Sequence, residues 1–408
     1  MKISRDVLTR SVLLVSILLP NICHSQWNTN GNTITATEFL GTNGSSTQPL
    51  RLRTGTNNAI VFQINGANEQ MRLDVNGNLG IGTTTPGRLL ELGAGDLNLT
   101  DGIIRIGDEE MVIYEAADNN LGLGTSDGLG SITTGTDNLF IGIDAGSSTT
   151  VGFQNTLIGL EAGRDNTEAE NNVFIGFNAG LVNTLGDRNI FIGSTAGDAN
   201  TVANNNIFIG FASGSSTTIG EQNVFIGSNT GDANVGGESN VFVGHEAGTT
   251  NTGGDNNTFV GRRAGRRNTI GTQNAFVGSR AGEENTDANR NSFFGECAGR
   301  LTTEGGLNTY IGAFSGFNND VGIQNTYMGN NAGFAIEEGD NNIIVGCNSG
   351  LDFTEGDDLV LLGGGAEADN GLTNAGAIGA NSMVEADNCL VLVVSVALME
   401  QPTALMLE

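Results

Sequence analysis

Four arginines within six residues form the cluster in this sequence that most suggests ligand binding. They are Arg262, Arg263, Arg266 and Arg267. Glu246 lies seventeen positions before Arg263, and Glu283 lies seventeen positions after Arg266. If residues stack at that interval, charges of opposite sign alternate along each column. We therefore expect solvated salt bridges, each worth ~0–1 kcal/mol, rather than a binding patch.

The other residues able to do chemistry are few. Two acidic turns, 168–170 and 337–340, could attract Ca²⁺, but neither contains the Gly-Gly-x-Gly-x-Asp pattern of calcium-binding β-rolls. His245 is the one histidine outside the N-terminal segment, which argues against a histidine metal cluster and against a catalytic triad. The sequence therefore predicts no catalytic residue, no metal site and no cofactor.

A column of threonines suggests a second kind of surface. A flat, regular threonine array on a solenoid is typical of ice-binding surfaces, although threonine ladders also form for structural reasons. Ice binding is therefore an alternative function that a thermal-hysteresis assay would test. The column consists of Thr150, Thr167, Thr184, Thr201, Thr218, Thr252, Thr269, Thr286, Thr303 and Thr354.

All of these residues are positioned by a seventeen-residue repeat. From Gly142 to Gly346, thirteen glycines recur without insertion or deletion, and each follows an apolar pair. The unit reads Asn-x-Phe-Ile-Gly-x-x-Ala-Gly-x-x-Asn-Thr-x-Gly-x-x. A fixed period with position-specific residues is typical of a solenoid. The repeat residues that we single out are Asn138, Phe140, Ile141, Gly142, Gly146, Asn206, Phe208, Ile209, Gly210, Gly214, Asn274, Gly278 and Gly282.

The repeat predicts an all-β fold, a parallel β-solenoid of about 13 coils of 17 residues. Its apolar run has strand length and lies between Gly and Asn turn signals. Successive coils would rise by ~4.8 Å, and no proline interrupts the ladders between Pro86 and Pro402. The glycines fit corners of positive φ or close backbone approach. For the Asn column, a side-chain amide ladder or a capped turn is favoured over a binding row.

Two neighbouring apolar columns predict a partner surface. The phenylalanine column begins at Phe140 and the isoleucine column at Ile141, and adjacent strand residues face opposite sides. If phenylalanine fills the interior, isoleucine forms an exposed stripe that another copy of the chain would cover. The alanine column, which begins at Ala145, would allow close approach near a symmetry axis. In the alternative, a bent corner turns both apolar residues inward.

The segments outside the repeat differ from it. We expect a signal peptide over 1–25, because basic residues precede a short apolar run and small residues precede Gln26. No segment is long enough for a membrane span. We also expect a β-rich N-terminal region, an imperfect entry coil, the solenoid, degenerate capping coils and an apolar tail that is truncated or altered. Their bounds are 26–118, 119–137, 138–358, 359–392 and 393–408.

Composition excludes further classes of function. The chain has 17 basic and 45 acidic residues and a net charge of −28, which disfavours nucleic acid as a partner. Cys297 and Cys347 would lie roughly 14 Å apart along the array, too far for a disulfide.

Three segments resemble known families. The repeat unit looks like the coils of bacterial and phage tail-fibre-like repeat proteins. The segment 374–382, followed by 388–392, is similar to the head repeat of trimeric autotransporter (YadA-like) adhesins. The segment 74–86 resembles the linker of fibre proteins that end in a self-cleaving chaperone. The resemblance implies a homotrimer of left-handed β-rolls, surface attachment or a fibre shaft, and a bacterium of Gram-negative type.

From these observations we expect an exported, non-enzymatic protein of the cell surface or the medium. It would be an adhesin-like fibre or shaft whose partners are its own copies and an environmental or host surface, glycan or matrix. The enzyme alternative, a secreted polysaccharide-cleaving β-helix, would need a local break in the repeat to form a cleft. No such break occurs between Gly142 and Gly350.

Overall fold

The computed structural model describes residues 58–64, 68–92, 103–106, 109–115, 117–124 and 131–393. The predicted signal peptide (1–25) and residues 394–408 of the predicted tail lie outside this part. The described residues form strands and turns and contain no helix. The chain divides into two compact units, one ending at Leu97 and the other beginning at Asn98.

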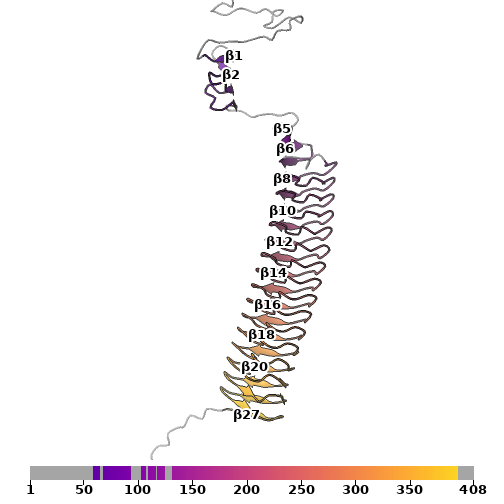
Figure 1. Ribbon diagram of the computed structural model, residues 1–408, viewed down its shortest axis with the longest axis vertical. Helices are drawn as coiled ribbons and strands as arrows, with labels where there is room; N and C mark the ends of the chain where they lie inside the picture. The colour runs from indigo at the N-terminus through magenta and orange to yellow at the C-terminus, as the bar shows by residue number, and fades with distance from the viewer. Residues whose placement is uncertain are drawn as a thin grey trace, which may run out of the picture. The chain divides into compact units, whose positions relative to one another are not determined.

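The first unit is a small sheet of four strands (Figure 1). Strand β2 pairs antiparallel with β1 and β3, and β4 pairs parallel with β3. The turn between β2 and β3 is closed by Asp74, whose Oδ1 accepts the backbone N–H groups of Asn76 and Asn78 at 2.8 Å. The bond from the Asn78 backbone lowers the pKa of the Asp74 carboxyl. The strands are β1 (Ile60–Ile64), β2 (Asn68–Leu73), β3 (Leu79–Ile81) and β4 (Leu90–Leu92).

The second unit is a parallel β-solenoid of about 16 turns. An antiparallel pair, β5 and β6, precedes it, and β7 begins the stack. The strands are β5 (Ile103–Ile106), β6 (Glu109–Glu115), β7 (Asn120–Leu123), β8 (Leu139–Ile141), β9 (Thr156–Ile158), β10 (Val173–Ile175), β11 (Ile190–Ile192), β12 (Ile207–Ile209), β13 (Val224–Ile226), β14 (Val241–Val243), β15 (Thr258–Val260), β16 (Ala275–Val277), β17 (Ser292–Phe294), β18 (Thr309–Ile311), β19 (Thr326–Met328), β20 (Ile343–Val345), β21 (Gly356–Asp357), β22 (Val360–Leu362), β23 (Glu367–Ala368), β24 (Leu372–Thr373), β25 (Gly376–Ile378), β26 (Met383–Val384) and β27 (Leu390–Leu392).

The register of the stack follows the sequence period. Each strand from β8 to β20 pairs in parallel with the next, and residue i lies beside residue i+17, as Phe174 lies beside Phe191. Figure 1 shows these short strands stacked along one side of the solenoid. After β22 the interval shortens, because Leu361 pairs with Ala377 and Ala377 with Val391. The predicted parallel β-solenoid is confirmed.

The phenylalanine column fills the interior. Each strand from β8 to β20 has three residues, and the middle side chain is buried in every one. From Phe174 to Tyr327 the aromatic rings stack at centroid distances of 4.7–4.9 Å with interplanar angles of 3–10°. This spacing matches the rise between hydrogen-bonded strands, so each coil contributes one ring to a continuous core.

The Asn column that begins at Asn138 forms a buried ladder beside the rings. Each Asn backbone N–H donates to the Oδ1 of the Asn one coil earlier, as Asn206 does to Asn189 at 2.9 Å. The Nδ2 group of Asn206 also donates to the carbonyl of Gly220 at 2.9 Å. The ladder satisfies a backbone donor and a backbone carbonyl in each coil, which a buried turn requires. Asn138 and Asn274 make the same contacts.

Glycine is required at two corners of the coil. Gly142, Gly210 and Gly278 have φ of 129–144°, and an added Cβ would lie 2.2–2.4 Å from the carbonyl oxygen of the glycine one coil later. The second set packs against the ring of its own coil. There Gly146, Gly214 and Gly282 have φ of 55–62°, and a Cβ would lie 2.5–2.7 Å from that ring. Both corners exclude every L side chain.

The alanine column lies in a different place from the one predicted. Ala145, Ala162 and Ala179 are at most 1% exposed and belong to the same core as the rings. The turn carries this column inward because the glycine corner reverses the chain immediately after the strand. Where serine occupies the column, as at Ser213, its hydroxyl donates to the carbonyl of Phe225 at 3.1 Å. The column therefore packs inside the coil and cannot line a symmetry axis.

Candidate functional site

The outer face of the strands carries a regular series of apolar side chains along the solenoid. In each strand the first and third residues face outward, so two columns flank the buried ring. The third residue of each strand belongs to the predicted isoleucine column, and its members Ile141 and Ile209 are half-buried. The alternative in which a bent corner turns both apolar residues inward is therefore wrong.

The first coils carry the most apolar part of this face. From β10 to β14 the outward residues are Val or Ile throughout. A further exposed column, two residues after each strand, adds large side chains after β8, β9, β10 and β12. Its members Ile143, Leu160, Phe177 and Phe211 are 49%, 41%, 47% and 57% exposed. We refer to the two outward strand columns as the outer strand face.

Two of the four arginines singled out in the sequence, Arg263 and Arg266, gather with two arginines of later coils around one buried carboxylate. Glu283, whose side chain is 3% exposed, lies within 4.0 Å of four guanidinium groups. Two groups approach its Oε1, Arg263 at 4.0 Å and Arg266 at 3.5 Å. The other two approach Oε2, Arg280 at 3.8 Å and Arg300 at 2.9 Å. We refer to these four arginines as the arginine cluster.

Two further pairs accompany the arginine cluster. Arg263 donates from Nε to Glu246 at 2.7 Å, and Arg267 pairs with Glu284 at 2.6 Å. Desolvation alone would raise the pKa of the Glu246 carboxyl, but the hydrogen bond and charge of Arg263 outweigh it and lower that pKa. The predicted pairs across one coil are confirmed. The expectation that all of them are solvated surface pairs is wrong for Glu283, because four arginines cover it.

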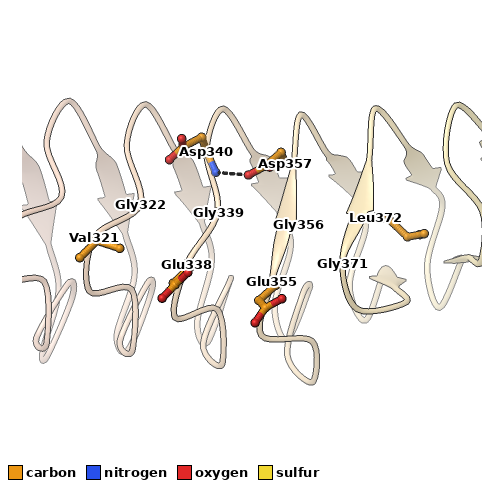
Figure 2. Close-up of a pocket in the computed structure, with 10 residues that line it drawn as sticks. All are labelled: Val321, Gly322, Glu338, Gly339, Asp340, Glu355, Gly356, Asp357, Gly371 and Leu372. Carbon is orange, nitrogen blue, oxygen red and sulfur yellow. Dashed lines mark hydrogen bonds between the residues drawn. The ribbon is translucent and has the colours of Figure 1, made fainter.

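The acidic turn 337–340 belongs to a shallow hollow of about 390 Å³ on the last regular coils. Figure 2 shows Asp340 and Asp357 near one edge of adjacent coils, and Glu338 and Glu355 lower in the view. The carboxylate of Asp357 accepts the backbone N–H of Asp340 at 2.9 Å, so it joins one coil to the next. Among the described residues no three His, Cys, Asp or Glu side chains gather closely enough to hold a metal ion.

The threonine column uses its hydroxyls within the array. Thr150 Oγ1 donates to the carbonyl of Thr167 at 3.1 Å, and the same bond recurs at Thr184, where it measures 3.0 Å. Each bond joins one coil to the next across seventeen residues. The hydroxyl hydrogens of these residues therefore stabilise the stack instead of facing solvent.

The remaining reactive side chains are dispersed. His245 is half exposed and lies 3.9 Å from Glu246. Cys297, Cys347 and Cys389 are free, as the predicted separation required for the first two. Burial raises the pKa of the Cys297 thiol, which disfavours the reactive thiolate.

Comparison of the chain with known protein families, with curated proteins and with solved structures finds no match. No helix in the described residues is long and apolar enough to cross a membrane.

Two features were missed by the reasoning from sequence. The residue two after each corner glycine and the residue before each ladder Asn adopt positive φ although they are not glycine, as at Thr195 (54°) and Arg188 (56°). The frequent Asn at both positions was an available signal, because Asn tolerates this conformation. Nothing in the sequence predicted that four arginine side chains meet at Glu283. The repeat predicts the column in which a residue lies but not the direction of its side chain.

Proposed function

We propose that this protein is an exported, non-enzymatic structural protein, a fibre shaft with an adhesin-like role at a surface. It forms a homotrimer of left-handed β-rolls whose chains pack through their outer strand faces. The outer strand face is the single observation that carries this proposal.

The size of that face supports self-association. Thirteen strands at ~4.8 Å by three residues at ~3.3 Å give an area of roughly 600 Å². Monomeric proteins rarely expose an apolar patch larger than about 300–600 Å², and such patches are often binding surfaces. The outer strand face therefore reaches the upper end of this range and supplies about three quarters of the roughly 800 Å² that one partner contributes to a standard protein interface.

The regularity of the array supports a structural role over an enzymatic one. The same register continues from β8 to β20, so no coil is displaced to open a cleft. A stack whose interior repeats in every coil extends in one direction, which suits a spacer or shaft. The number of three chains, the surface attachment and the export follow from the resemblance to adhesin heads and fibre proteins and from the predicted signal peptide.

A pair of substitutions in one coil tests the proposal. Ile209→Glu places a charge on the outer strand face, and Ile219→Glu places the same charge on another column, where Ile219 is 59% exposed. We expect Ile209→Glu to reduce the molar mass in solution from three chains to one, because a buried unpaired carboxylate opposes association. Ile219→Glu should leave the mass unchanged. Equal effects of the two variants, or no effect of Ile209→Glu, would contradict the proposed interface.

A further inference from the structure

The arginine cluster has more positive charge than its own carboxylates neutralise. Its four arginines and Arg267 face Glu246, Glu283 and Glu284, which leaves two positive charges. The chain as a whole has a net charge of −28, so this is an exception on its surface. At physiological ionic strength the Debye length is about 8 Å, less than two coils, so distant acids are largely screened from this site.

Hydrogen bonding within the arginine cluster is incomplete. Arg300 donates to Glu283 Oε2 at 2.9 Å, and Arg263 donates to Glu246. The Nε groups of Arg266 and Arg280 are buried near Glu283 and have no hydrogen-bond acceptor. These two guanidinium groups are therefore held beside other cations by the charge of one carboxylate, and their own donors are not all used.

The outer parts of the same side chains are accessible. The side chains of the four clustered arginines are 29–34% exposed, whereas Glu283 beneath them is 3% exposed. The guanidinium carbon of Arg300 also lies over the ring of Phe317, 5.6 Å from the ring centroid, a cation–π contact that helps to hold this side chain in place. Guanidinium groups in a fixed orientation suit bidentate contacts with sulfate or phosphate oxygens.

We propose that the arginine cluster binds a compact oxyanion group of about two negative charges, either free phosphate or sulfate or a phosphate monoester carried by a glycan. The anion lies over Arg266 and Arg280 and balances the two uncompensated charges, while Glu283 keeps the guanidinium groups together from beneath. Because acids dominate the rest of the surface, a small charged group fits this site better than a long polyanion.

Titration calorimetry on the assembled full chain in low salt tests this assignment. One arm uses inorganic phosphate and the other uses a monosaccharide phosphate, so the arms present the same anion with and without a sugar. The stronger response shows whether the group is recognised alone or on a sugar. Two charge-assisted contacts are expected to give a Kd of about 1 mM. If neither compound gives a heat of binding at ten times this concentration, the proposed anion site is refuted.

Two variants and a control locate the binding. Arg266→Gln and Arg280→Gln each remove one excess charge and leave three arginines around Glu283. Each should weaken binding about thirtyfold, the equivalent of one such contact. Arg188→Gln removes another exposed arginine, 3.7 Å from Glu170, and should leave the affinity unchanged. Thermal unfolding checks that the variants are folded, and equal affinities for all four proteins would overturn the proposal. The binding is measured independently of the number of chains, so its failure is distinct from failure of the shaft proposal.

Discussion

The coils over 138–256 and the coils over 257–307 share one interior and differ in their outer surface. Both stack phenylalanine rings at 4.7–4.9 Å and both pair their strands at an interval of seventeen. In the first group the exposed turn positions carry large apolar side chains, as at Phe177 and Phe211. In the second group the turns carry the arginine cluster. The interior thus determines the fold, and the outer columns can vary without changing it.

The largest expected effect tests the shared interior. Gly210→Ala in the first group and Gly278→Ala in the second each place a Cβ 2.2–2.3 Å from a backbone carbonyl of the next coil. Each should destabilise the solenoid by about 4 kcal/mol or more, because the backbone strain and the overlap add. Denaturant unfolding and limited proteolysis would measure the loss.

Gly253→Ala is the matched control, because its added Cβ has no atom within 4 Å. It should change the stability by less than ~0.5 kcal/mol. A large loss for only one of the two corner variants would show that the two groups of coils do not share an interior.

A second pair tests the ring stack. Phe208→Ala and Phe276→Ala each remove a fully buried ring between two stacked neighbours. Each should cost about 3–5 kcal/mol in the free energy of unfolding. The exposed Ile219 serves as control, and its replacement by Ala should be nearly neutral. Unequal losses for the two phenylalanines would contradict a shared interior in the two groups of coils.

A third variant tests the arginine cluster, which distinguishes the second group of coils from the first. Glu283→Gln removes the carboxylate that the arginine cluster shares, so four guanidinium groups lose their common counter-ion. We expect a loss of about 2 kcal/mol, the usual contribution of a hydrogen bond to a charged group. The loss, measured by denaturant unfolding, should be smaller in high salt, because added ions screen the repulsion among the arginines. An equal loss at both salt concentrations would contradict this electrostatic explanation.

The smallest expected effect concerns an acid of the first group. Burial, together with the charge of Asp232, raises the pKa of the Asp198 carboxyl. Its ionised form therefore destabilises the fold at neutral pH, and this cost disappears as the pH falls below the raised pKa. Asp198→Asn should raise the Tm at pH 7 by at most ~2 °C, and the gain should shrink in acid.

Asp165→Asn is the control variant for Asp198→Asn. Asp165 accepts a hydrogen bond from Arg164 at 2.9 Å, so its replacement should lower the Tm or leave it unchanged. If the two variants shift the Tm in the same direction, the assignment of the Asp198 effect to burial and repulsion fails.

Much of the fold could be predicted from the sequence, because a fixed period determines which residues lie beside one another in successive coils. The interval of seventeen predicted that Phe174 lies beside Phe191, and strand alternation predicted that Ile209 faces outward when Phe208 is buried. Ala145 was misplaced because alternation holds only within the strand. After Gly142 the turn residues with positive φ redirect the chain, and the column enters the core.

The surface sites were less predictable for a related reason. The period places Glu283 between Arg266 and Arg300 along one column, as the sequence indicated. It does not indicate that Arg263 and Arg280 turn toward the same carboxylate from a second column. That contact depends on the path of the turn between the columns, which sequence spacing alone does not define.

The central claim is that the outer strand face is an interface between copies of this chain. The molar mass of the unmodified protein in solution, measured by light scattering over a range of concentrations, tests it most directly. We predict three times the mass of the single chain at every concentration. A mass of one chain throughout would contradict the claim, because the aliphatic outer strand face would then be stable without a partner.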